Sequence, residues 1–84
     1  MSIKIFLHGL ESSSRGTKAV FFREKYPDML TPDFTGPLGQ RLSLLEQVLG
    51  TQVGIRMVGS SFGGLMGTLF AMKEESRVER LILL

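Results

Sequence analysis

Cysteine is absent from this chain of 84 residues, which excludes disulfide cross-links and thiolate metal sites. A chain without cysteine suits the reducing cytoplasm, where we expect the protein to be located. Basic residues are scattered singly along the sequence, and the net charge is only +2. Because no basic stripe forms, we expect neither nucleic acid nor an acidic membrane as a partner. The sequence predicts no metal site and no cofactor.

Long hydrophobic runs are also missing. The first apolar run is broken at His8 and is shorter than the roughly 7–15 apolar residues of a signal peptide. Residues 57–72 carry no charge, but as a helix they would extend only about 24 Å, short of the roughly 30 Å of a bilayer core. Their GxxxG spacings are the feature that favours a membrane helix. Two adjacent serines interrupt the apolar run, so we expect no membrane association.

Two kinds of segment alternate along the chain. Short apolar runs predict strands at residues 3–7, 29–31, 53–58 and 80–84. Helices are predicted at residues 16–26, 38–49 and 63–73. The second helix has a leucine stripe and a glycine stop, formed by Leu38, Leu42, Leu45, Leu49 and Gly50.

This alternation predicts an α/β fold with a parallel sheet and helices on both faces. The last predicted strand runs to the end of the sequence in apolar residues, without a capping turn. We therefore expect residues 1–84 to be a partial domain, a fragment of a longer one.

The segment 59–63 reads Gly-Ser-Ser-Phe-Gly and contains the pattern G-x-S-x-G, centred on Ser61. It lies between a predicted strand and a predicted helix, which is typical of a nucleophile elbow. Such a turn is so tight that the residues two before and two after the nucleophile must be small, as Gly59 and Gly63 are. The nucleophile itself sits in a strained backbone conformation that exposes its hydroxyl. We therefore predict that Ser61 is a catalytic nucleophile.

Other interpretations of the glycine-rich segment fit less well. A dinucleotide fingerprint beginning at Gly59 would need glycine where Ser61 stands, and a P-loop would need Gly-Lys-Ser/Thr, whereas residues 16–18 read Gly-Thr-Lys. Ser60 is a poor nucleophile candidate because the bulky Phe62 would occupy its plus-two position. A glycine-rich structural turn with two incidental serines remains the alternative.

Three stretches together, residues 7–13, 32–36 and 59–64, make the sequence resemble the α/β-hydrolase superfamily, in a small esterase-like branch. The resemblance covers essentially the whole chain. It implies the N-terminal portion of an α/β-hydrolase fold, truncated after the strand that follows the nucleophile helix. It also implies that the backbone N–H groups of Leu10 and Phe62 form an oxyanion hole. Each such donor contributes about 3–4 kcal/mol to an acyl-transfer transition state.

The resemblance implies structural roles for three further residues. His8 is the one histidine of the chain, but it precedes Ser61, whereas the family places its catalytic acid and histidine after the nucleophile. We therefore expect His8 and Gly9 to order the supporting loop, and Asp33 to order its turn. The triad acid and histidine have no match in residues 1–84. Because a serine hydroxyl needs an adjacent base, we expect this fragment alone to be inactive.

The full-length protein is therefore expected to be a carboxylesterase-like serine hydrolase that cleaves a small-molecule acyl substrate through an acyl-enzyme on Ser61. Two alternatives remain open at this stage. One is a thioesterase or peptidase of the same fold, and the other is a non-catalytic module that binds a ligand or a protein.

Overall fold

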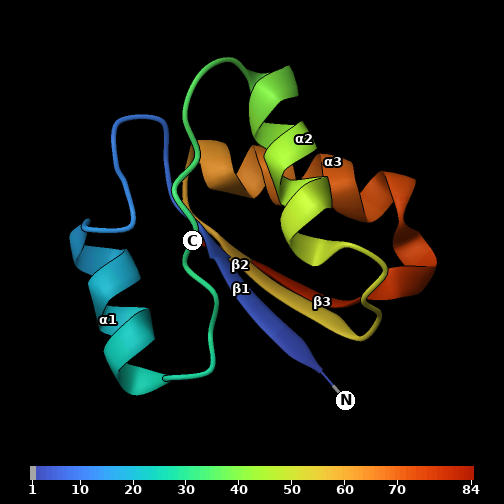
Figure 1. Cartoon of the computed structure of the whole chain (residues 1–84), viewed down its shortest axis with the longest axis horizontal. Coiled ribbons are helices and arrows are strands. Elements are labelled where there is room, and N and C mark those ends of the chain that lie inside the picture. Colours follow the sequence, from blue (N-terminus) through green and yellow to red (C-terminus); the bar gives the residue numbers. More distant parts are fainter. Residues whose placement is uncertain (1) are drawn as a thin grey trace.

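A computed structural model describes residues 2–84 as one small α/β unit, and Figure 1 shows its elements. In chain order these are β1 (Ile3–Leu7), α1 (Thr17–Lys25), α2 (Leu38–Leu49), β2 (Ile55–Gly59), α3 (Phe62–Lys73), the short 3₁₀ helix η1 (Glu75–Arg77) and β3 (Val78–Leu83). Strands and helices alternate as predicted, except that α1 is followed by α2 with no strand element between them.

The three strands form a parallel sheet in the order β1-β2-β3, so β2 is central. At their carboxyl ends, Leu7 of β1 pairs with Gly59 of β2, and Gly59 pairs with Leu83 of β3. The connections that follow β1 and β2 therefore leave the sheet side by side, at the edge where parallel α/β folds bind their ligands.

Helices cover both faces of the sheet, as predicted: α1 packs on one face, and α2 and α3 pack on the other (Figure 1). Alternate residues of a strand point to opposite faces. Phe6 of β1 accordingly packs with Ala19 and Met29 on the α1 side. The larger core, on the α2 and α3 side, consists of Ile5, Leu7, Phe34, Leu45, Leu49, Ile55, Met57, Met66 and Phe70.

The predicted strand at residues 29–31 is reduced to an isolated bridge between Leu30 and Ile5. Leu30 N–H donates to the Lys4 oxygen and Phe6 N–H donates to the Leu30 oxygen, each at 2.9 Å. The next ladder bond would need an N–H at Pro32, which proline lacks. The brief strand predicted at residues 29–31 is therefore present only as this single parallel bridge.

Two other strands differ from prediction in detail. β2 begins at Ile55 rather than at residue 53, because Gly54 takes a positive φ of 67° that extended backbone does not allow. β3 spans Val78–Leu83 rather than residues 80–84; within residues 2–84 it has one strand neighbour, and Ile82 and Leu83 are exposed.

The uncharged run at residues 57–72 is divided between two elements. Gly59 ends β2 and Gly63 lies in α3, so the run does not form one helix. Among residues 2–84, no helix has the length and apolar character needed to cross a bilayer.

Candidate active site

The connection between β2 and α3 consists of Ser60 and Ser61 alone. Ser61 has φ 53° and ψ −119°, and among residues 2–84 it is the one non-glycine residue with positive φ. For a residue with a Cβ such a conformation costs about 1–3 kcal/mol. Ser60 is 8% exposed, whereas Ser61 is exposed. The strand–helix turn therefore presents one serine, as the motif predicted.

The two glycines that flank this turn are required by close backbone packing. A Cβ at Gly59 would lie 2.6 Å from the Gly63 oxygen, and real Cβ atoms do not approach heavy atoms that closely. A Cβ at Gly63 would collide with the carbonyl oxygen of Leu7 and lie 2.7 Å from that of His8. The start of α3 is therefore pressed against the end of β1, which explains why small residues are needed at both positions.

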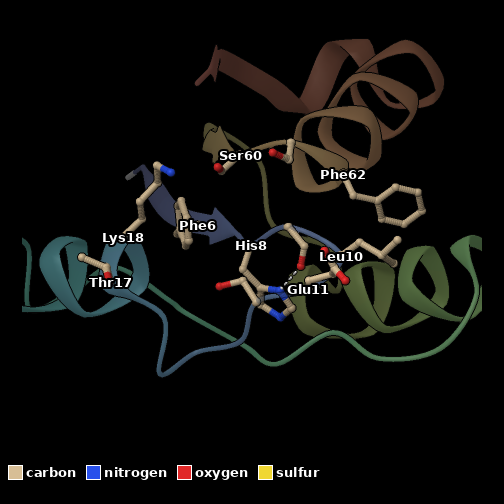
Figure 2. Close-up of a pocket in the computed structure, with 11 residues that line it drawn as sticks. Phe6, His8, Leu10, Glu11, Thr17, Lys18, Ser60 and Phe62 are labelled. Atoms are coloured by element: carbon tan, nitrogen blue, oxygen red, sulfur yellow. Dashed lines mark hydrogen bonds between the residues drawn. The ribbon is translucent and has the colours of Figure 1, made fainter.

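The loop after β1, residues 8–16, lies against Ser61. A Cβ at Gly9 would be 3.3 Å from the Ser61 Cβ and 3.9 Å from its Oγ. Figure 2 shows the pocket between them, with Leu10 and Glu11 contributed by this loop, Ser60 by the β2–α3 turn, Phe62 by the start of α3, and Thr17 and Lys18 by α1. This open pocket, about 520 Å³ in volume, is lined by Phe6, His8, Gly9, Leu10, Glu11, Ser12, Thr17, Lys18, Ser60, Ser61 and Phe62.

The structure thus brings Ser61, Leu10, Phe62, His8 and Gly9 to one pocket. Gly59 and Gly63 do not line it but shape the turn that carries Ser61. The pocket walls formed by α1 and Phe6 were not anticipated from the sequence.

The backbone N–H groups of Leu10 and Phe62 donate no hydrogen bond to any group within residues 2–84. By contrast, Gly63 N–H donates to the Ser60 oxygen (2.9 Å) and Gly64 N–H to the Ser61 oxygen (2.8 Å). Phe62 is the first residue of α3, where the helix dipole is positive. Both amides therefore belong to residues that line the pocket and lack a partner among residues 2–84.

His8 is buried, at 2% exposure, and both of its ring nitrogens are engaged. Its Nε2 accepts the Phe34 N–H at 2.8 Å, so the proton is on Nδ1, which donates to the Gly9 oxygen at 2.8 Å. In Figure 2 the ring points away from the turn that carries Ser60 and Phe62. This geometry favours a role in ordering the loop over a role as base for Ser61.

Asp33 binds the same loop at Ser14. Its carboxylate accepts the Ser14 N–H (2.6 Å) and the Ser14 hydroxyl (2.8 Å). These two hydrogen bonds, the backbone one foremost, lower the pKa of Asp33 below its ordinary value. Arg23 of α1 donates to the Ser14 oxygen at 3.0 Å. Asp33 therefore orders the loop after β1 rather than its own turn alone.

Arg41 of α2 was not anticipated from the sequence. This side chain is 5% exposed, its Nε donates to the Gly36 oxygen at 2.7 Å, and its guanidinium lies 5.4 Å from the centre of the Phe62 ring. The position of Arg41 in the sequence is the signal that could have identified it. Residue 41 follows Leu38 by three and precedes Leu45 by four, so it falls on the buried stripe of the helix.

No group of three or more histidine, cysteine, aspartate or glutamate residues in the described part of the chain could hold a metal ion. Comparison of the sequence with protein-family models and with curated proteins finds no match. The functional interpretation therefore depends on the geometry of this site.

Proposed function

We propose that the protein is a serine hydrolase in which Ser61 attacks the carbonyl carbon of an ester or related acyl bond. The observation that carries this proposal is the exposed Ser61, held at positive φ in a two-residue turn and packed against Gly9. The backbone conformation of Ser61 is unfavourable for every residue except glycine, and yet this position has a side chain, which lines the pocket. Strain of this kind is concentrated at functional sites.

In the proposed reaction, Ser61 Oγ forms a bond to the substrate carbonyl carbon while a general base takes its proton. The carbonyl electron pair moves to the oxygen, and the resulting oxyanion accepts hydrogen bonds from the N–H groups of Leu10 and Phe62. The electron pair then returns to the carbon, the carbon–oxygen bond to the alcohol breaks, and the base gives its proton to the leaving alcohol. Water next attacks the acyl carbon in the same way, which breaks the bond to Ser61 Oγ, releases the carboxylic acid and restores the Ser61 hydroxyl. The substrate would be a small acyl compound, and thioesters and peptides would follow the same steps.

Within residues 2–84 no side chain hydrogen-bonds the Ser61 hydroxyl, and His8 is committed to Phe34 and Gly9. We therefore propose that these residues form the N-terminal portion of an α/β-hydrolase fold. In that arrangement the triad acid and histidine would come from chain that follows β3. The same observation favours the second candidate, a non-catalytic binding module that retains the turn without a base.

Labelling by a fluorophosphonate probe separates the two candidates, and the protein should be expressed from its complete gene so that any downstream base is present. We expect covalent labelling that is lost in Ser61→Ala. The neighbouring Ser60→Ala is a matched control, because Ser60 is buried in the same turn, and this variant should keep its labelling. A complete protein that is folded but unlabelled would contradict the hydrolase proposal and support the binding module.

A further inference from the structure

Arg41 is a buried cation whose hydrogen-bonding groups are only partly used. Its Nε binds the Gly36 oxygen, but its Nη1 is buried and has no partner among residues 2–84. The four ion pairs of the described residues, Lys4–Asp28, Arg56–Glu79, Lys73–Glu46 and Arg77–Glu74, do not include it. A guanidinium stays charged in proteins, and burying a charge without a counter-charge is costly.

Arg77 shows what a fully satisfied arginine looks like in the same molecule. It also lies over an aromatic ring, 5.5 Å from the centre of Phe70. Its three nitrogens, however, donate to the Gln52 oxygen, the Gly50 oxygen and the Glu74 carboxylate. Packing on an aromatic ring therefore does not by itself leave an arginine unpaired, so the unpaired charge of Arg41 needs a separate explanation.

The explanation lies in what Arg41 contacts. Its guanidinium is placed over the ring of Phe62, and Phe62, which lines the Ser61 pocket, also has a backbone N–H without a partner among residues 2–84. A cation–π contact holds the ring under the charge and so restrains the residue that carries this N–H. A positive charge in a poorly solvated position also acts over a longer distance than one in water.

We propose that Arg41 is a positioning residue for the oxyanion of the Ser61 adduct. This inference rests on the proposed hydrolase function. Negative charge develops when Ser61 Oγ bonds to the carbonyl carbon and the electron pair moves to oxygen. The oxyanion is then a counter-charge for the buried Arg41 that the ground state does not provide, while the contact of Arg41 with the Phe62 ring keeps the donor N–H in place. An interaction that strengthens only in the charged state accelerates the reaction rather than tightening substrate binding.

The test compares two ligands of the same alkyl chain in the protein expressed from its complete gene. An alkylboronic acid forms an anionic tetrahedral adduct with an active-site serine, whereas the corresponding primary amide stays neutral. In Arg41→Met we expect the Kd of the boronic acid to rise about tenfold and the Kd of the amide to change less than twofold. Arg77→Met, which removes the other ring-stacked arginine, should change neither ligand's affinity by more than twofold.

Arg41→Lys keeps the charge and should bind the boronic acid within about threefold of the wild type, so it carries the test if Arg41→Met fails to fold. Unchanged boronic-acid affinity in Arg41→Met, equal weakening of both ligands, or a tenfold loss in Arg41→Lys would each overturn the role of Arg41 while leaving Ser61 as nucleophile. A wild-type protein that forms no boronate adduct at Ser61 would instead overturn the proposed function, and this inference with it.

Discussion

Positions 50 and 61 have almost the same backbone conformation but different residues. Gly50, which ends α2, has φ 52° and ψ −123°, and Ser61, which precedes α3, has φ 53° and ψ −119°. Glycine adopts such angles without steric cost, whereas serine does not. At position 50 the chain has the residue that the conformation favours. At position 61 it keeps a side chain despite the cost, as the role proposed for the Ser61 hydroxyl would require.

The surroundings of the two positions differ as well. A Cβ added at Gly50 would find no atom within 4 Å, so nothing but backbone conformation limits the residue there. The residues on either side of Ser61 are instead fixed by tight main-chain packing: Ser60 N–H donates to the Leu7 oxygen at 3.0 Å, and Gly63 approaches the end of β1. Strain persists where neighbouring structure dictates the conformation, and the β2–α3 turn meets that condition.

We expect the largest effect from a variant that disrupts the packing around Ser61. In Gly63→Ala the new Cβ would overlap the carbonyl groups of Leu7 and His8, and main chain in a sheet cannot move aside as a flexible side chain can. We expect the free energy of unfolding to fall by about 3 kcal/mol or more, measured by urea denaturation followed by circular dichroism.

Gly39→Ala is the matched control for that variant. Gly39 lies in α2, and a Cβ there would meet no atom within 4 Å. We expect this variant to gain about 0.5–1 kcal/mol, because alanine favours the helix over glycine. If the two alanine variants had similar stabilities, the close contact between α3 and β1 would not be what fixes the turn.

The ends of α2 and the turn at Ser61 could be predicted from the sequence, because residues close together in the chain determine them. The leucine stripe and Gly50 gave both ends of α2 correctly, and the glycine spacing around Ser61 located the turn between β2 and α3. The brief strand predicted at residues 29–31 pairs with β1 at Leu30 alone, because Pro32 cannot donate the next ladder bond.

The features that could not be predicted depend on residues far apart in the chain. The contact of Arg41 with Phe62 and the bond from Phe34 N–H to His8 join segments separated by more than 20 residues. Which side chains face one another across such distances is set by how α2 and α3 pack on the sheet, and periodicity gives the buried face of a helix but not its partner.

A smaller effect is expected for the backbone strain at position 61, which a comparison of two variants measures directly. Ser61→Gly relieves it, whereas Ser61→Ala keeps it without the hydroxyl, so we expect Ser61→Gly to be about 1 kcal/mol more stable than Ser61→Ala. Gly50→Ala, at the matching backbone angles and in open space, should lose about the same amount. Thermal or urea unfolding of the three variants gives the comparison. Equal stabilities of Ser61→Gly and Ser61→Ala would mean that the turn stores no strain.

The smallest effect concerns the loop that packs against Ser61 and has no counterpart at Gly50. Asp33 holds this loop through Ser14, and these hydrogen bonds lower the pKa of Asp33 from its ordinary value of 3.8. A carboxyl whose pKa is lowered by folding stabilises the fold above its ordinary pKa, and that contribution is lost as the pH falls through the lowered value. We therefore expect the Ser14 amide resonance to shift in NMR spectra recorded from pH 5 downward, while the Gly50 amide resonance stays constant. In Asp33→Asn the Ser14 amide should no longer titrate, and a titration that persisted there would assign the loop's pH response to another group.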